Sequence, residues 1–347
     1  MKNNKKILSL VLALVVTVSV LGAFSLMFPA ESGGDGPSKE TTSTLITEPA
    51  PNRELQWTVQ KAFTNNLQCV IVDNDRLIAA GYGGKFYVSE DGVSFETVSL
   101  DLPYELNSNH YILDIIKVEE RFWFVDRFNG IYSCSENFTD CKLEYNGSDL
   151  RSFAYANGEF FAVSPHGSVH FDGEKWVQYE DFSYDVCVAK GIYGGEVFYF
   201  VNASRCLFSL DEYGTFEVLF GASSYNNPVC IEYIGDHIYI GGKFATLDRI
   251  DMRTGQTSFT ATLAPDSSEA YVYDFVEFDG KLYFCAHLAD ANSTALIFYS
   301  DDGGANWQAC ENADFTGKIT DLIVFKDSLF AFCDNGKYYI GSYQEVE

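Results

Sequence analysis

The sequence is short of basic residues and of methionine. Its 347 residues include 23 Lys and Arg against 49 Asp and Glu, which gives a formal net charge of −26. Nucleic-acid binding requires a basic face that neutralises phosphates, so this balance argues against nucleic acid and favours neutral, cationic or cation-bridged partners. With only 3 methionines but 28 glycines and 16% aromatic residues, the composition favours many short strands joined by turns. We therefore expect an all-β fold.

Motifs for metal and cofactor chemistry are also missing. No C-x-x-C occurs, which argues against a zinc site, and His166 and His170 share one segment without a third ligand in register. The sequence has no phosphate-binding glycine loop, no nucleophile elbow and no Ser/His/Asp arrangement. We predict no catalytic residue, no metal ligand set and no cofactor, apart from a structural calcium alternative considered below.

The amino-terminal segment, residues 1–28, has the pattern of a membrane-targeting sequence. Lys2, Lys5 and Lys6 precede an uncharged run, residues 7–28, that is long enough to cross a hydrocarbon core. The end of the run offers no pair of small residues at an A-x-A-like cleavage site. We expect an uncleaved signal-anchor, a transmembrane helix; the alternative is a cleaved signal peptide that releases a secreted protein. The preceding lysines predict a cytoplasmic amino terminus and an extracytoplasmic bulk.

The composition changes after the apolar run. Residues 29–53 are rich in Ser, Thr, Gly, Pro and Glu, which is typical of a flexible linker. From residue 54 to residue 347 a repeat emerges, and its clearest element is a turn followed by a strand rich in aromatic and β-branched residues. This element occurs in seven segments: Asn74–Gly81, Glu119–Asp126, Asn157–Ser164, Gly194–Val201, Gly235–Gly242, Asp279–Ala286 and Lys326–Cys333.

Each copy follows a short apolar strand and precedes a third strand, and most copies continue into a fourth. The unit is therefore a four-stranded antiparallel meander of about 35 to 47 residues, the size of a propeller blade. We predict a seven-bladed β-propeller over residues 54–347, preceded by the transmembrane helix. The last copy ends after its third strand, whereas the domain begins with a strand around residues 55–60. We expect this strand, with Trp57, to complete the last blade and remove an exposed sheet edge.

A turn motif supports the same architecture. One full copy of the pattern S-x-D-x-G-x-x-W is formed by Ser300, Asp302, Gly304 and Trp307, and a shortened copy by Ser89, Asp91, Gly92 and Phe95. Weaker copies span Asp172–Trp176, Ser209–Phe216 and Asp251–Phe259. In this spacing the Ser and Asp oxygens accept hydrogen bonds from turn amides, the glycine takes a strained backbone position, and the aromatic ring packs between sheets.

The motif resembles the Asp-box, also called the BNR repeat. Over residues 54–347 the chain is similar in architecture to the propellers of sialidases, sortilin-type receptors, oligoxyloglucan hydrolases and photosystem assembly factors. The resemblance implies a β-propeller in which the Asp-boxes are structural hairpins remote from the active face. It implies a fold more than an activity, because one fold supports many functions.

A sialidase-like activity would imply an Arg-Ile-Pro segment, three arginines for the substrate carboxylate, a Tyr–Glu nucleophile pair and an Asp acid/base. No Arg-Ile-Pro segment occurs, and no triad is evident among Arg127, Arg151, Arg205 and Arg249. We therefore interpret the chain as a non-catalytic member of this superfamily. An extracellular glycoside hydrolase with two carboxylates remains the alternative, since 49 acidic residues supply many pairs.

Three aspartates share one position of the repeat. When the copies are aligned, Asp114, Asp274 and Asp321 fall at the same place on the innermost strand of their blades. Around a central channel they could bind a cation such as calcium, or a polar ligand. Alternatively, their carboxylates satisfy backbone amides at the start of the inner strand.

The nine cysteines suggest some disulfides in an oxidising compartment, and the odd number leaves at least one thiol without a partner. Cys134 and Cys141 flank a predicted turn between two strands, so we predict a disulfide between them. N-x-Ser/Thr sequons begin at Asn137, Asn146, Asn202 and Asn292, and the sequence does not decide whether they carry glycans.

Together these observations predict a membrane-anchored, extracytoplasmic propeller. Because the repeat is complete and no catalytic set is recognisable, we expect a non-enzymatic module that binds an extracellular protein or glycan through the loops of one face. The glycoside hydrolase is the competing interpretation.

Overall fold

The computed structural model describes residues within the segment Glu54–Glu347. The described residues are 55–61, 63–102, 106, 109–156, 158–164, 167–179, 186–193, 197–202, 206–210, 216–221, 228–263, 270–288, 294–310 and 315–343. The predicted membrane segment 1–28 and the predicted linker 29–53 lie outside the described residues.

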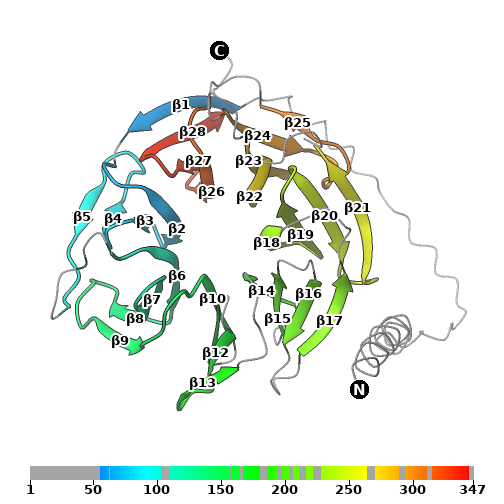
Figure 1. Cartoon of the computed structure of the whole chain (residues 1–347). Helices are drawn as coiled ribbons and strands as arrows, with labels where there is room; N and C mark the ends of the chain where they lie inside the picture. Colours follow the sequence, from blue (N-terminus) through cyan, green and yellow to red (C-terminus); the bar gives the residue numbers. More distant parts are fainter. Residues whose placement is uncertain are drawn as a thin grey trace, which may run out of the picture. The chain divides into compact units, whose positions relative to one another are not determined.

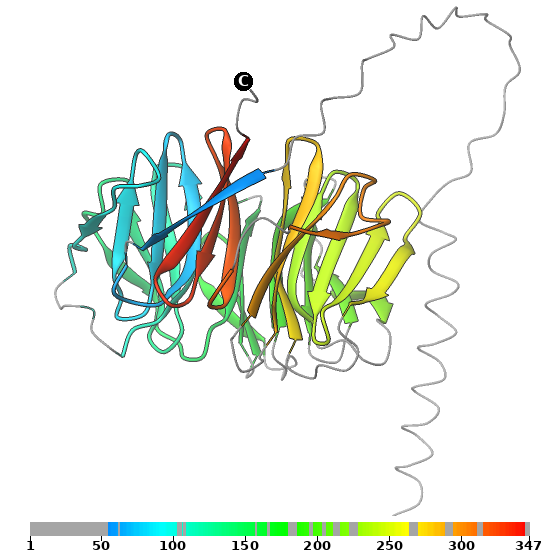
Figure 2. The ribbon, with the colours of Figure 1, turned by 90° about the horizontal axis from the view of Figure 1, so that it is seen from above.

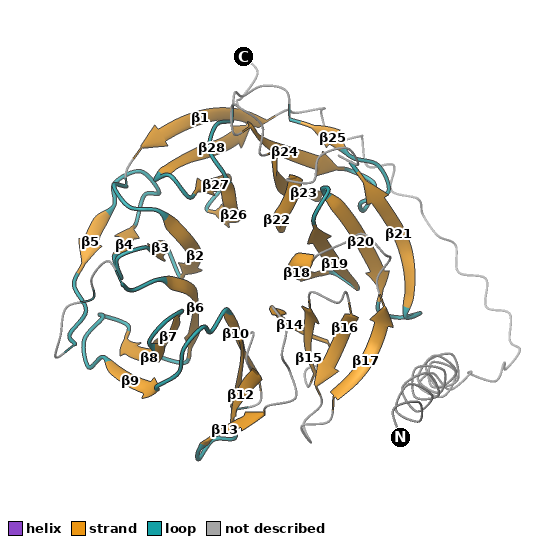
Figure 3. Ribbon diagram, viewed as in Figure 1, coloured by secondary structure: helices purple, strands orange, loops and turns teal. Residues whose placement is uncertain are grey.

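The described residues form antiparallel strands grouped in blades of four (Figure 3). The blades on one side of the ring consist of β2 (Leu67–Asp73), β3 (Arg76–Gly81), β4 (Phe86–Ser89) and β5 (Glu96–Val98); β6 (Ile112–Val118), β7 (Arg121–Asp126), β8 (Gly130–Ser135) and β9 (Lys142–Tyr145); and β10 (Ser152–Ala156), β11 (Glu159–Ser164), β12 (Gly167–Phe171) and β13 (Trp176–Tyr179). The remaining sheets consist of β14 (Val186–Tyr193), β15 (Val197–Asn202), β16 (Cys206–Leu210) and β17 (Phe216–Gly221); β18 (Pro228–Ile234), β19 (His237–Gly242), β20 (Thr246–Asp251) and β21 (Gln256–Thr262); β22 (Ala270–Phe278), β23 (Lys281–Leu288), β24 (Thr294–Ser300) and β25 (Gln308–Ala309); and β26 (Ile319–Phe325), β27 (Ser328–Cys333), β28 (Lys337–Tyr343) and β1 (Leu55–Lys61).

The sheets are arranged around a common axis (Figure 1). The first strand of each meander is innermost, and the last blade has the strand order β1-β28-β27-β26. Its fourth strand comes from the start of the domain, because β1 pairs antiparallel with β28 from Leu55 opposite Tyr343 to Lys61 opposite Lys337. The two ends of the domain thus share one sheet, and the otherwise open edge of β28 is covered.

Two backbone devices recur in the blades. The turns between first and second strands hold residues at positive φ, such as Asn74 (53°), Glu119 (54°) and Lys326 (52°), which matches the right-handed twist of a hairpin. Five innermost strands carry a register shift at one shared place, between residues 67/69, 112/114, 228/230, 272/274 and 319/321. These bulges set the position at which the predicted aspartates lie.

The hydrophobic core is divided among the seams between blades. One cluster joins Ile78 and Phe86 of the β2–β5 blade to Phe122 and Phe124 of the β6–β9 blade, all with an exposed fraction of 0%. Another joins Tyr283 of the β22–β25 blade to Leu329 of the last blade. Each thin sheet is therefore stabilised mainly by its two neighbours.

The fold-class prediction, a seven-bladed β-propeller preceded by a transmembrane helix, needs correction. The structure is an all-β propeller with four-stranded antiparallel blades, but the described residues contain no helix, and so none that could cross a membrane. The predicted transmembrane helix, residues 1–28, lies outside the described residues.

Candidate functional site

The meander topology gives the ring two different faces. At one face, which we call the start face, each innermost strand begins and the second and third strands are joined. At the opposite end face lie the turns between first and second strands and between third and fourth strands. Figure 2 shows the strands running between these two faces. The predicted turn motifs lie at the end face, and an aromatic cluster that the sequence analysis did not predict lies at the start face.

A buried polar network holds the start face of the β6–β9 blade. Asp126, at the end of β7, has an exposed fraction of 0%, and His110 has one of 7%. His110 Nδ1 contacts Asp126 Oδ2, and the Asn129 side-chain amide donates to the same oxygen at 3.0 Å. Asp126 Oδ1 accepts the backbone N–H of Phe128 at 3.1 Å. This network fixes both the turn after β7 and the residue before Tyr111.

An aromatic row lies on this support. The ring centroids of Tyr82 and Tyr111 are 4.7 Å apart, and those of Tyr111 and Phe128 are 5.8 Å apart, both with edge-to-face geometry. The Arg127 guanidinium carbon lies 5.1 Å from the Phe128 ring centroid. Phe128 has an exposed fraction of 48%. The row therefore presents apolar ring surface and a cation to solvent from a fixed backbone.

Two arginines beside the aromatic row, Arg127 and Arg151, both form an ion pair with the Asp149 carboxylate. Arg127 Nε and Arg151 Nη2 each lie 3.1 Å from Asp149 Oδ1, and both side chains are about one-third exposed. Because Arg151 directly precedes β10, these ion pairs connect the β6–β9 blade to the β10–β13 blade at this face. We call Tyr82, Tyr111, Phe128, Arg127 and Arg151 the aromatic–arginine patch.

The patch escaped prediction because its members are distant in sequence. Tyr82 follows the second strand of one blade, and Tyr111 precedes the first strand of the next. An isolated antiparallel bridge joins them across the seam, and an equivalent bridge joins Lys243 to Tyr271 across the seam between the β18–β21 and β22–β25 blades. An alignment of the residue after each second strand with the residue before the next innermost strand would have indicated this pairing.

Two of the three predicted aspartates, Asp114 and Asp274, form hydrogen bonds across the seams. Asp114 Oδ2 accepts the Ser152 hydroxyl at 2.8 Å and the Phe153 N–H at 3.3 Å, both from the next blade. Asp274 Oδ2 accepts the Leu322 N–H of its next blade at 2.7 Å. Asp321 follows the corresponding bulge of β26. In the part of the chain that the structure describes, no three His, Cys, Asp or Glu residues are grouped so that they could hold a metal ion.

The full turn motif binds its own amides. The Ser300 hydroxyl donates to Asp302 Oδ1 at 2.8 Å and accepts the Gly304 N–H at 2.7 Å. Asp302 Oδ1 also accepts the N–H groups of Ala305 and Asn306. These amides lower the pKa of Asp302 to about 2. Gly304 has φ +87°, and Trp307 packs against Phe284 with centroids 4.7 Å apart, so the motif closes the hairpin between β24 and β25.

The shortened motif is built in the same way. The Gly92 N–H donates to the Ser89 hydroxyl at 2.9 Å, and Asp91 Oδ1 accepts the N–H groups of Val93 and Ser94. Phe95 packs against Phe63 at 4.7 Å. The turn also reaches the neighbouring blade, where Tyr338 donates its hydroxyl to the Val93 carbonyl at 3.3 Å and Lys326 Nζ donates to the Glu90 carbonyl at 2.7 Å. Both motifs therefore have structural contacts at the end face.

The end face also contains an ionic network beside a cavity of about 520 Å³. Asp73, with a side-chain exposure of 3%, binds Arg76 at 2.8 Å and Lys117 at 2.7 Å. Burial alone would raise the pKa of Asp73, but hydrogen bonds from Lys117 and Arg76 lower it overall. Lys117 also contacts Glu136. The two cations, Arg76 and Lys117, thus match the charges of the two carboxylates, Asp73 and Glu136.

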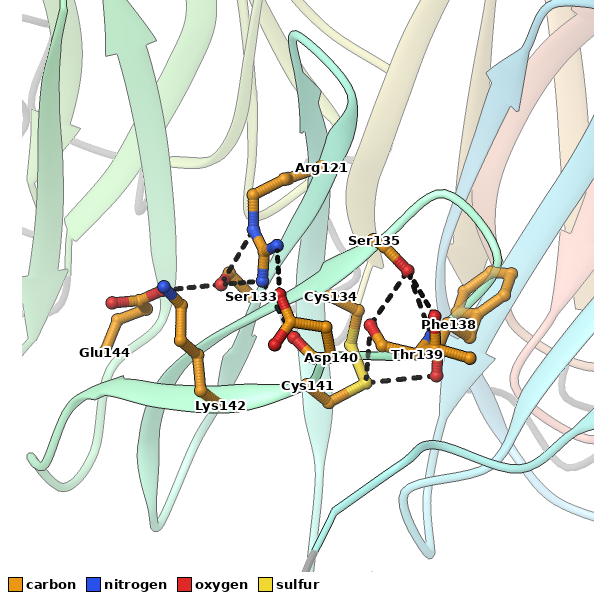
Figure 4. Close-up of polar contacts among 10 residues, drawn as sticks. All are labelled: Arg121, Ser133, Cys134, Ser135, Phe138, Thr139, Asp140, Cys141, Lys142 and Glu144. Carbon is orange, nitrogen blue, oxygen red and sulfur yellow. Dashed lines mark hydrogen bonds and ion pairs between the residues drawn. A yellow bond between two sulfur atoms is a disulfide. The ribbon is translucent and has the colours of Figure 1, made fainter.

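The predicted disulfide between Cys134 and Cys141 is confirmed (Figure 4). It closes the turn between β8 and β9, in which Phe138 is 3% exposed and stacks on Phe122 with centroids 5.2 Å apart. Arg121 donates to the Ser133 hydroxyl and to the Asp140 carboxylate, both at 2.9 Å. The crosslink and these hydrogen bonds hold the Phe138 ring in the seam between two blades.

Comparisons with known proteins agree on the fold. The sequence matches no protein-family model and no curated protein. YCF48 bound to a D1 peptide has a TM-score of 0.65 at 13% identity, covering 83% of this chain and 97% of its own. Virginiamycin B lyase from Staphylococcus aureus has a TM-score of 0.67 at 11% identity, covering 84% of this chain and 100% of its own.

A third similar structure is the extracellular domain of the one-component system BT4673 from B. thetaiotaomicron. Its TM-score is 0.62 at 13% identity, and the match covers 82% of this chain and 39% of that chain. The three proteins have different roles, and their identities to this chain are low. What they share with it is the architecture, and the chain therefore has the β-propeller fold.

Proposed function

We propose that this chain is a membrane-associated, extracytoplasmic binding module that holds a protein or peptide ligand on its aromatic–arginine patch. The proposal rests on one observation above all: Phe128, with an exposed fraction of 48%, lies between Tyr111 and Arg127 on a backbone fixed by the buried Asp126. Exposed aromatic and arginine side chains on a rigid support are the residues that most often dominate the affinity of protein interfaces.

One similar structure supports a peptide ligand. YCF48 is a propeller that has been seen with a bound D1 peptide, so this fold can present a peptide-binding face. The likeness to this chain is at 13% identity and concerns the fold. We therefore infer the ligand class from the patch chemistry, in which ring surfaces favour apolar side chains and the two arginines favour carboxylates or carbonyl oxygens of a partner.

A glycoside hydrolase is the weaker candidate. Such an enzyme needs one carboxyl group with a raised pKa as general acid and a second that remains ionised. The described carboxyl groups whose pKa is shifted, Asp73, Asp91, Asp172, Asp251 and Asp302, all have lowered pKa values. Amide hydrogen bonds and neighbouring cations hold these groups ionised, which suits structural turns better than proton transfer.

The extracytoplasmic location is part of the proposal. The Cys134–Cys141 disulfide supports an oxidising compartment, where such bonds persist. The apolar run at residues 7–28 and the lysines before it support association with a membrane and export of the domain. A membrane-impermeant protease added to intact cells should degrade the domain, whereas protection of the domain until the cells are lysed would contradict an extracytoplasmic location.

The binding proposal is tested with a protein and peptide array probed with the full chain. Candidate ligands are then measured against the Phe128→Ala and Arg127→Ala variants, which should each weaken binding about tenfold or more. Leu143→Ala is the matched control, because Leu143 lies on the outer strand of the same blade with an exposed fraction of 42% and outside the patch. Equal affinity in all variants would contradict the patch as the binding surface.

A further inference from the structure

A second part of the start face brings tyrosine and lysine side chains together on the opposite blades. Tyr271 and Tyr273 lie near the start of β22, the innermost strand of the β22–β25 blade, and both are half-buried. Their ring centroids are 6.1 Å apart. Tyr273 is the extra residue of the bulge between Val272 and Asp274.

One lysine reaches these rings from the preceding blade. Lys243 lies in the connection between β19 and β20, and its backbone forms an isolated antiparallel bridge with Tyr271. Its Nζ lies 6.0 Å from the Tyr271 ring centroid and 5.6 Å from that of Phe244. At the corresponding bridge between Tyr82 and Tyr111 the same position is held by the uncharged Tyr82.

A second lysine reaches the rings from the following blade. Lys318 directly precedes β26, and its Nζ lies 4.1 Å from the Tyr273 ring centroid. The Lys318 carbonyl accepts the backbone N–H of Asp334 at 2.9 Å, which fixes the main chain at that point. The start of β22 is thus bracketed by one ammonium group from each neighbouring blade. We call Lys243, Tyr271, Tyr273 and Lys318 the lysine–tyrosine site.

Neither ammonium group has a counter-ion among the described residues. Lys117 and Lys142 form ion pairs with carboxylates of the β2–β9 blades, whereas Lys243 and Lys318 form none with a described residue. This is unexpected for half-buried lysines in a chain with a net charge of −26. Burial lowers the pKa of Lys318, and the charges of Asp334 and Asp321 only partly oppose that effect. A half-buried ammonium group that rests on an aromatic ring and forms no ion pair with a described carboxylate gains most from an added anion.

We propose that the lysine–tyrosine site binds a small organic anion, whose carboxylate or phosphate group contacts Lys318 and is further attracted by Lys243. This goes beyond the proposed protein-binding function, because the site uses other blades and a different ligand chemistry from the aromatic–arginine patch. The tyrosine rings suit a ligand that has an apolar or aromatic part beside its charge. We expect the larger contribution from Lys318, which burial has partly removed from solvent and whose Nζ lies 4.1 Å from the Tyr273 ring centroid.

The test is isothermal titration calorimetry on the full chain with benzoate, phenyl phosphate and the uncharged analogue benzamide. The wild-type chain should bind at least one of the two anions and bind benzamide at least about tenfold more weakly. Comparing benzoate with phenyl phosphate distinguishes a carboxylate from a phosphate as the preferred group. Binding of either anion supports the proposal if it depends on Lys318.

The variants make that dependence specific. Lys318→Met keeps the length of the side chain and removes its charge, so it should weaken anion binding about tenfold, with a smaller loss in Lys243→Met and retention in Lys318→Arg. Lys281→Met is the matched control, since Lys281 Nζ lies 4.9 Å from the Tyr299 ring centroid in the same blade, at the end face. No anion binding by the wild-type chain, or equal losses in Lys281→Met and Lys318→Met, would overturn the proposal. Failure here leaves the array result for the Phe128 variant unaffected.

Discussion

Leu322 donates its backbone N–H to the carboxylate of Asp274 across the seam between two blades, with the nitrogen and oxygen 2.7 Å apart. The same contact joins Phe153 to Asp114 on the other side of the ring. In each case the carboxylate follows the bulge of one innermost strand and the amide belongs to the next. The aspartates therefore link adjacent blades at the level where the innermost strands begin.

Removing one of these carboxylates should destabilise the domain. Asp114→Ala leaves the N–H groups of Ile115 and Phe153 without their acceptor, so we expect the free energy of unfolding to fall by about 2 to 4 kcal/mol. Chemical denaturation of the two proteins measures the difference. Asp301→Ala, an exposed residue of an end-face turn, is the control and should change the free energy of unfolding by less than about 0.5 kcal/mol. Equal stability of Asp114→Ala and wild type would refute the seam role.

The disulfide should contribute to stability by restricting the unfolded chain. Its sequence separation is 7 residues, for which loop-closure entropy predicts about 2 to 3 kcal/mol. We expect the Cys134→Ser/Cys141→Ser double variant to unfold at a lower temperature than the wild type, and a reducing agent to shift only the wild type. Unfolding followed by circular dichroism, with and without the reductant, makes the comparison. Identical melting of oxidised and reduced wild type would contradict this role.

The turn at Asp302 should make stability depend on acid pH. Turn amides lower the pKa of folded Asp302 to about 2, below the value of about 3.9 for an unfolded aspartate. Because the folded pKa is the lower one, the ionised turn stabilises the fold above about pH 4, and this contribution is lost as the pH falls towards 2. The stability difference between wild type and Asp302→Asn should therefore narrow over that interval. Denaturant midpoints at several pH values measure it, and a constant difference from pH 5 to pH 2 would argue against the assignment.

The closing strand depends on a close approach between Trp57 and Gly341. A Cβ added at Gly341 would lie 2.9 Å from the Trp57 ring, closer than such atoms approach in folded proteins. We expect Gly341→Ala to lower the free energy of unfolding by about 1 to 3 kcal/mol, because β1 can no longer lie flat on β28. Gly158→Ala is a comparison in which an added Cβ meets nothing within 4 Å, although its φ of +87° adds backbone strain. Trp57 fluorescence should shift only in the Gly341 variant.

Features that repeat within a blade were accessible from the sequence. The turns, the strand rich in aromatic residues and the pair Cys134 and Cys141 each lie within one stretch of chain, so spacing alone indicates which residues meet. The shared position of Asp114 and Asp274 was also predicted, because alignment of the copies does not require knowledge of the seams. The transmembrane helix of the fold prediction, by contrast, was inferred from one apolar run, and the described fold consists of strands alone.

Features that depend on the seams were not accessible. Tyr111 contacts Tyr82 across one seam, and Lys318 contacts Tyr273 across another. In both pairs the two residues are separated in the sequence by about the length of one blade. Sequence spacing does not say which side chains of two neighbouring blades point toward each other. The buried pair of His110 and Asp126 was missed for a related reason: a lone histidine before a strand gives no pattern until the turn after the next strand is folded against it.

Hydrogen–deuterium exchange on the complex with a ligand found in the array locates the bound surface. The account predicts added protection of the backbone amides at residues 82–85, 109–112 and 127–130, with loss of that protection in Phe128→Ala. Protection confined to the end face, at residues 73–76 and 134–141, would contradict the aromatic–arginine patch as the binding surface and would indicate the opposite side of the ring.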